Sequence, residues 1–228
     1  MEYEFLSFSW GRNAFSFRRI QTGKMKVLLS AILLLLGPSC WSQPLEESKL
    51  ALWLDEPGSG FNPEVHTLAF EAGGSCGVAA FGSPEAHDLG LASISYGHMW
   101  GDVKGDDHWY RGNFEWRVEL FGGMDFSSED EWLVGLTPHL RYNLATGTRW
   151  VPFADFGAGV TATGIGPPDL SKTFEFNLQG SVGVHRFLTD NLAITAETRY
   201  LHLSCAGISQ PNRGLNGVMG MIGVTWYY

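Results

Sequence analysis

The sequence predicts an all-β protein: an eight-stranded antiparallel up-and-down transmembrane β-barrel of the outer-membrane type. Apolar and polar residues alternate with a period of two in eight successive segments, which is the pattern of strands with one apolar face. The composition is 14% aromatic and only 17% charged, against roughly 25% charged residues in ordinary soluble domains. The length of 228 residues suits one such domain.

Clusters of Gly, Asp, Ser and Pro separate the alternating segments from one another. In chain order the expected strands are 66–75, 88–100, 108–122, 130–145, 149–163, 172–188, 191–204 and 215–228. Each is long enough to cross a bilayer as a tilted strand, which takes about 9–11 residues. Hydrocarbon offers backbone groups no partner, so the strands must close into a barrel, and eight is an allowed even number.

Two segments show the alternation most clearly. In 109–121, Phe114 and Val118 share one face, and the charged residues Glu115 and Arg117 share the other. In 132–144 the apolar face is again on the even positions, but Pro138 falls among them. Because a closed barrel has no edge strand to accommodate the missing N–H of a proline, we expect a bulge there. The segments 174–186 and 218–228 repeat the same even-numbered apolar face.

The two faces indicate which side meets lipid. One face is aromatic near its ends, as an interfacial girdle requires, with Tyr110, Trp116, Trp132, Tyr142, Trp150, Tyr200 and Trp226. The other mixes both charge signs, with Arg111, Glu115, Arg117, Glu119, Arg141, Asp155, Glu175, Glu197 and Arg199. Such a mixture suits a narrow barrel interior filled by paired charges. The alternative is a secreted, lipocalin-like ligand-binding barrel, which would have the same alternation turned inside out.

The two ends of the chain favour the membrane barrel. Hydrophobic residues at every second position up to Tyr228 resemble the C-terminal signal of bacterial outer-membrane barrels. Residues 25–42 have a basic start and a short apolar core, so we interpret them as a signal peptide and expect the protein in the cell outer membrane. Residues 1–24 are an upstream extension, 43–64 a periplasmic lead-in, and 65–228 the barrel domain.

Several classes of function are excluded or disfavoured. A net charge of −9 disfavours a nucleic-acid binder. The sequence has no H-E-x-x-H or C-x-x-C motif and no phosphate-binding or dinucleotide fingerprint, so we expect no metal and no cofactor. Two cysteines follow the signal peptide, Cys76 and Cys205, and their pairing is left open. A homodimer is likewise left open beside a monomer.

His202 and Ser204 break the alternation in the seventh segment, because both are polar on the face that otherwise meets lipid. Residues two apart on a strand lie about 6.8 Å apart on one face, close enough for their side chains to form a hydrogen bond. A serine beside a histidine is the minimum for acyl transfer, since the imidazole takes the hydroxyl proton as the oxygen attacks an ester. The alternative is that both residues are polar only because they sit at the membrane rim.

The surrounding residues resemble a known family. The run Tyr200-x-His202-x-Ser204-x-Ala206-Gly207, followed by Pro211-Asn212-x-Gly214-x-Asn216, is similar to the outer-membrane lipid A 3-O-deacylases, the PagL-like acyloxyacyl hydrolases. Upstream, Trp150-Val-Pro-Phe153 and Phe156-Gly-Ala-Gly159 also look like that family. The resemblance implies an eight-stranded barrel esterase over about residues 65–228 that acts on lipid A of lipopolysaccharide.

The resemblance also implies roles for individual residues. Ser204 would be the nucleophile and His202 the general base, with oxyanion donors just after the serine, from Cys205 to Gly207. The chain departs from the family twice, because Cys205 stands where an Asn is usual and Asn216 aligns with the Glu of the triad. The leading hypothesis is therefore a lipid A 3-O-deacylase with the catalytic group His202, Ser204 and Asn216. The alternative is a catalytically silent barrel with a structural or adhesion role.

Overall fold

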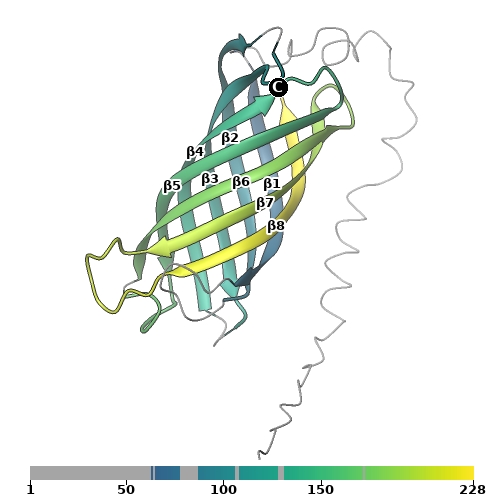
Figure 1. Cartoon of the computed structure of the whole chain (residues 1–228). Coiled ribbons are helices and arrows are strands. Elements are labelled where there is room, and N and C mark those ends of the chain that lie inside the picture. The colour runs from purple at the N-terminus through teal and green to yellow at the C-terminus, as the bar shows by residue number, and fades with distance from the viewer. Residues whose placement is uncertain (1–62, 64, 78–86, 106–107, 128–130, 172) are drawn as a thin grey trace, which may run out of the picture. The chain divides into compact units, whose positions relative to one another are not determined.

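The chain forms a closed barrel of eight antiparallel strands in sequence order (Figure 1). The computed structural model describes residues 63, 65–77, 87–105, 108–127, 131–171 and 173–228. The strands are β1 His66–Gly77, β2 Leu89–Lys104, β3 Gly112–Asp125, β4 Glu131–Leu144, β5 Trp150–Thr163, β6 Phe174–Phe187, β7 Leu192–Ser204 and β8 Leu215–Tyr227. Pairing of β1 with β8 completes the ring, so no strand has an unpaired edge. The predicted fold class is confirmed.

The largest boundary difference concerns β3. It begins at Gly112 rather than near 108, because His108 N–H donates to Gly105 O and Arg111 N–H donates to His108 O, which are contacts of turns and not of a strand. The partner strand β2 runs on to Lys104 by a shift of register between Trp100 and Lys104. Two-residue alternation does not reveal where a hairpin turns, so this boundary depended on local turn geometry.

The bulge expected at Pro138 is not found. On one side Pro138 pairs with Val118, and on the other the register is unchanged from Leu136↔Val160 to His139↔Gly157. Thr137 and Pro138 are not among the paired residues of the ladder between β4 and β5, although the register is the same on both sides of this gap. A local gap in pairing therefore accommodates the missing N–H of the proline without an inserted residue.

The outer wall of the barrel is apolar. Even-numbered residues of the strands point outward, and large hydrophobic side chains such as Phe70, Leu136, Phe156, Val182 and Ile222 are exposed on it. Trp116, Trp132, Trp150 and Trp226 from the predicted girdles are also exposed. No helix among the described residues is long and apolar enough to span a membrane.

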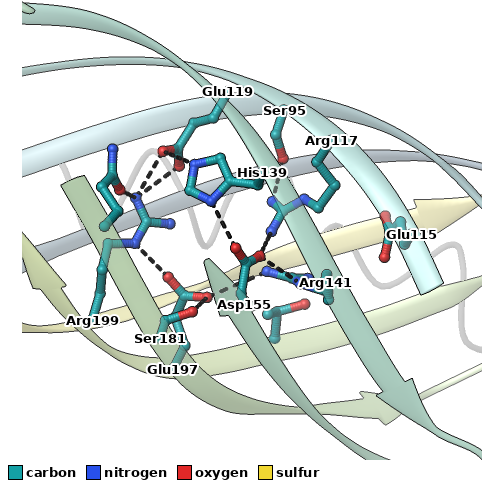
Figure 2. Close-up of polar contacts among 12 residues, drawn as sticks. Ser95, Glu115, Arg117, Glu119, His139, Arg141, Asp155, Ser181, Glu197 and Arg199 are labelled. Atoms are coloured by element: carbon teal, nitrogen blue, oxygen red, sulfur yellow. Dashed lines mark hydrogen bonds and ion pairs between the residues drawn. The ribbon is translucent and has the colours of Figure 1, made fainter. Parts of the chain in front are cut away.

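Odd-numbered side chains fill the interior in three layers. The middle layer is a network of buried ions centred on Arg117, Arg141 and Arg199, which contact Asp155, Glu119 and Glu197 (Figure 2). Apolar side chains cover this network on both sides. One cluster includes Leu133, Leu201, Leu203, Leu215 and Met219, and the other includes Met99, Val151, Phe187 and Tyr227. The interior is therefore a packed core with charges at its centre.

The three segments predicted before the barrel lie outside the described residues, apart from Pro63. These are the extension 1–24, the signal peptide 25–42 and the lead-in 43–64.

We predict that Arg199→Met destabilises the barrel by about 3–5 kcal/mol, because it leaves the buried carboxylate of Glu119 without its arginine and removes one of the two arginines that contact Glu197. Urea unfolding of the protein in lipid vesicles measures the change. The control is Lys104→Met, which removes an exposed cation and should change the unfolding free energy little. Equal stability of the two variants would contradict a structural role for the network.

Candidate active site

β7 and β8 join through the segment 205–214 at one end of the barrel (Figure 1). Three residues at that end of β7 have outward parity. Tyr200, His202 and Ser204 occupy alternate positions of β7, and His202 lies directly opposite Asn216 of β8. The register therefore places all four residues at positions with outward parity, as predicted.

The three residues proposed from the sequence form a continuous hydrogen-bonded chain. His202 Nε2 lies 3.1 Å from Ser204 Oγ, and His202 Nδ1 lies 2.8 Å from Asn216 Oδ1. The serine and the histidine are half-buried, whereas Asn216 is fully buried. This is the geometry of a nucleophile, a base and a residue that orients the base.

The amide oxygen of Asn216 fixes the tautomer of the imidazole. Because Oδ1 is only an acceptor, His202 Nδ1 must carry the hydrogen and donate it to that oxygen. The lone pair of Nε2 then faces Ser204 and can accept the hydroxyl hydrogen. A neutral asparagine therefore supplies the orientation that a general base needs.

Tyr200 is a fourth member of this chain of hydrogen bonds, and the sequence placed it in the aromatic girdle and in the family motif without a role at the site. Its hydroxyl donates to Asn216 Oδ1 over 2.6 Å, so one oxygen accepts from both Tyr200 and His202. The available signal was parity, since Tyr200 precedes His202 and Ser204 on the same face of β7. The tyrosine holds the asparagine side chain in place.

The turn that follows Ser204 is tight. Ile208 N–H donates to Cys205 O over 3.1 Å, and the two central residues have positive φ, 53° for Ala206 and 79° for Gly207. This combination is typical of a type I′ turn, which usually has Gly or Asn at such positions. The alanine is held in a conformation that an L-residue seldom adopts.

The residues predicted to supply oxyanion donors, Cys205 and Gly207, lie in this turn. The backbone N–H of Cys205 donates to Asn212 Oδ1 over 3.3 Å. Gly207 is exposed at the centre of the turn. Asn212 is a contact that the sequence reasoning missed, and no signal in the sequence indicated that its side chain folds back onto Cys205.

The thiol of Cys205 is free and buried, and it donates to Ser209 O over 3.3 Å. The side chain of Cys76, its suggested partner, lies outside the described part of the structure. Within that part, no group of three or more His, Cys, Asp or Glu side chains is arranged to hold a metal ion.

A closed eight-stranded barrel with an apolar outer wall and an ion-filled interior defines a β-barrel of the outer-membrane type. A family model described as lipid A 3-O-deacylase (PagL) matches residues 90–225, from β2 to β8. The chain belongs to this family. Its location in the outer membrane, predicted from the sequence, agrees with that membership and with the barrel.

Several solved structures are similar to this one. The outer membrane enzyme PagL is 18% identical, with 69% of this chain and 97% of that chain covered and a TM-score of 0.49. Neisserial surface protein A (NspA) is 16% identical, with 72% and 95% covered and a TM-score of 0.48. OprG from Pseudomonas aeruginosa is 10% identical, with 73% and 97% covered and a TM-score of 0.45. A search of the curated proteins found no match.

We predict that ¹⁵N spectra of the histidine-labelled protein show His202 as the Nδ1–H tautomer, because Asn216 Oδ1 is the acceptor of that hydrogen. In Asn216→Leu the acceptor is lost, and both tautomers should appear. A His202→Gln variant assigns the signal. An Nε2–H tautomer in the native protein would contradict the site geometry described here.

Proposed function

We propose that the protein is a serine esterase of the outer membrane that hydrolyses the 3-O-linked hydroxyacyl chain of lipid A. The observation that carries the proposal is the chain Ser204–His202–Asn216 on the lipid-facing wall of a member of the lipid A deacylase family. Polar side chains are costly at this face, so a hydrogen-bonded trio there calls for a function.

The proposed orientation brings the site to its substrate. With the N-terminal end of the barrel on the periplasmic side, odd-numbered strands run outward, and the end of β7 reaches the outer leaflet. In a Gram-negative outer membrane that leaflet holds lipopolysaccharide, whose acyl esters lie near the headgroup boundary. Ser204, the last residue of β7, would thus meet an ester at its own depth.

The first half of the reaction forms an acyl-enzyme. Ser204 Oγ attacks the ester carbonyl carbon while its proton passes to His202 Nε2. The tetrahedral intermediate collapses by cleavage of the bond between the carbonyl carbon and the sugar oxygen. His202 returns the proton to that oxygen, which leaves as the sugar hydroxyl, and the acyl chain remains on Ser204.

The second half releases the fatty acid. A water molecule gives a proton to His202 Nε2 as its oxygen attacks the acyl-enzyme, and collapse of this second intermediate returns the proton to Ser204 Oγ. The hydroxy fatty acid and the free enzyme are the products, so no cofactor or metal is required.

The oxyanion of each intermediate needs a donor close to Ser204. The nearest backbone candidate is the N–H of Cys205, whose hydrogen bond to Asn212 Oδ1 is long at 3.3 Å. We propose that the negatively charged oxygen replaces Asn212 as the acceptor, because a charged acceptor binds an N–H more strongly than a neutral amide does. In this role the cysteine contributes its backbone, and its side chain is not needed.

The proposal also covers the other segments of the chain and the expected partners. Residues 25–42 would direct export, with 1–24 as an upstream extension and 43–64 as a periplasmic lead-in. Residues 65–228 would form the esterase domain. Lipid A and the membrane are the expected partners, and a homodimer stays open.

Ser204→Ala should abolish the loss of one hydroxyacyl mass from lipid A in Gram-negative cells that express the protein, because it removes the nucleophile. Mass spectrometry of extracted lipid A is the measurement. Thr198→Ala, which removes a hydroxyl from the same outward face of β7, should leave the loss intact. If Ser204→Ala still removes the chain, Ser204 is not the nucleophile.

Asn216→Asp should raise kcat about fivefold, because a carboxylate at this position stabilises the imidazolium by roughly 1 kcal/mol more than an amide does. Aspartate has nearly the shape of asparagine and can accept from the same two donors, Tyr200 and His202. Release of hydroxy fatty acid from purified lipopolysaccharide measures the rate. Asn191→Asp, an added charge in the exposed β6–β7 turn, is the control. An unchanged or lower rate in Asn216→Asp would contradict the assigned role.

The second candidate is a catalytically silent barrel with a structural or adhesion role. Two observations favour it: the N–H of Cys205 already has an acceptor, and Asn216 carries no charge. Lipid A that keeps every acyl chain in cells with confirmed outer-membrane insertion of the protein would support this candidate.

A further inference from the structure

The segment that leads into β8 is held from outside its own hairpin. Both Arg213 N–H and Gly214 N–H donate to the backbone oxygen of Asp169, over 3.1 Å each, and Asp169 lies between β5 and β6. Gly214 has a φ of +72°, and a Cβ there would lie 3.2 Å from His202 Cε1. Asn216 follows two residues later, so the carbonyl of Asp169 sets where the start of β8 meets His202.

The side chain of Asp169 in turn faces a buried histidine at ion-pair distance. His87 Nε2 lies 3.4 Å from Asp169 Oδ2, and His87 Nδ1 lies 2.5 Å from Asp125 Oδ2 at the end of β3. All three side chains are at least nine-tenths buried. The carboxylates contact opposite nitrogens of the ring, so they do not converge on one point as metal ligands would.

His87 itself is fixed to the rigid part of the barrel. Ser75 Oγ of β1 contacts both His87 O, at 3.3 Å, and the N–H of Leu89, at 2.9 Å. Asp88 N–H donates to Ser127 Oγ over 2.5 Å, just beyond β3. The histidine is therefore anchored to β1, which pairs with β8, and to β2 and β3.

Contacts thus run across the mouth of the barrel from Asp125 through His87 and Asp169 to Gly214. Asn216, two residues after Gly214, bonds to His202, which lies 3.1 Å from Ser204 Oγ. Leu170, next to Asp169, is fully buried in the apolar cluster below the mouth, which adds a second anchor to this segment. The side chains of His87, Asp125 and Asp169 are directed at one another, so no role in contacting a substrate is assigned to them.

We propose that His87, Asp125 and Asp169 form a polar clamp that positions the start of β8, and with it Asn216 and His202, for attack by Ser204. They are positioning residues for the reaction, and this role rests on the proposed function. Because proton transfer depends on the alignment of His202 with Ser204, loss of the clamp lowers kcat and leaves KM unchanged.

The test is His87→Asn, whose shorter side chain cannot join both carboxylates. The matched control is His139→Asn. His139 is also a buried imidazole between two carboxylates, 2.7 Å from Asp155 Oδ1 and 3.4 Å from Glu119 Oε2, but it lies in the central network (Figure 2). Both variants lose the same kind of contact, and only His87 is connected to the start of β8.

For the full-length protein in detergent with purified lipopolysaccharide, we expect His87→Asn to lower kcat between about 10-fold and 100-fold with KM unchanged. His139→Asn should keep the native kcat. Asp169→Asn, which keeps the shape and an acceptor oxygen, should retain more activity than Asp169→Ala. The proposal is overturned if His87→Asn and His139→Asn lower kcat equally, or if neither does.

A second readout separates this proposal from the proposed function. The ¹⁵N signal of the His202 imidazole reports its alignment with Asn216 without any substrate. The clamp requires this signal to change in His87→Asn and to stay native in His139→Asn. If the native protein releases no fatty acid, the proposed function fails, and the signal still decides whether the clamp positions His202.

Discussion

Hydrocarbon leaves backbone N–H and C=O groups no partner except one another, and the rest of this structure depends on that constraint. It forces eight strands into a ring in which β1 pairs with β8. Once the ring is closed, the two-residue repeat of a strand assigns each side chain to the lipid or to the interior. The apolar wall, the buried ion network and the position of the candidate site all follow from this assignment.

Polar side chains have different surroundings inside and outside the barrel. Inside, charged residues such as Arg199 and Glu119 are paired with one another and covered by apolar side chains at both ends. Outside, His202 and Ser204 are polar at the very end of β7, where the wall gives way to the segments that connect the strands. Their partner Asn216 is fully buried although it lies on the outward parity, because Tyr200 and His202 bond to it.

The connecting segments complete the site. The tight turn after Ser204 brings Asn212 onto the N–H of Cys205, and the carbonyl of Asp169 holds the start of β8. These contacts come from segments that are far apart in the sequence and meet only at one end of the barrel. The geometry of the site therefore depends on several segments at the mouth of the barrel, although its reactive atoms belong to two neighbouring strands.

The parity of Tyr200, His202, Ser204 and Asn216 could be predicted from the sequence because a strand has one invariant repeat. The expected bulge at Pro138 was wrong because a local gap in pairing, and not an inserted residue, accommodates the proline between β4 and β5, and alternation does not reveal strand pairing. The hydrogen bond from Cys205 N–H to Asn212 Oδ1 depends on the path of a ten-residue connection, which the alternation of residues does not encode. The contacts of His87 involve three separate segments, so the alternation of residues could not predict them either.

The central claim is that Ser204, on the outer wall, is a nucleophile activated by His202. Labelling the folded protein in vesicles with an alkyl fluorophosphonate, followed by mass spectrometry of its peptides, tests this claim directly. We expect a phosphonyl group on Ser204 in the native protein and none in His202→Ala. An unlabelled Ser204 in the native protein, or a label on Ser209 instead, would contradict it.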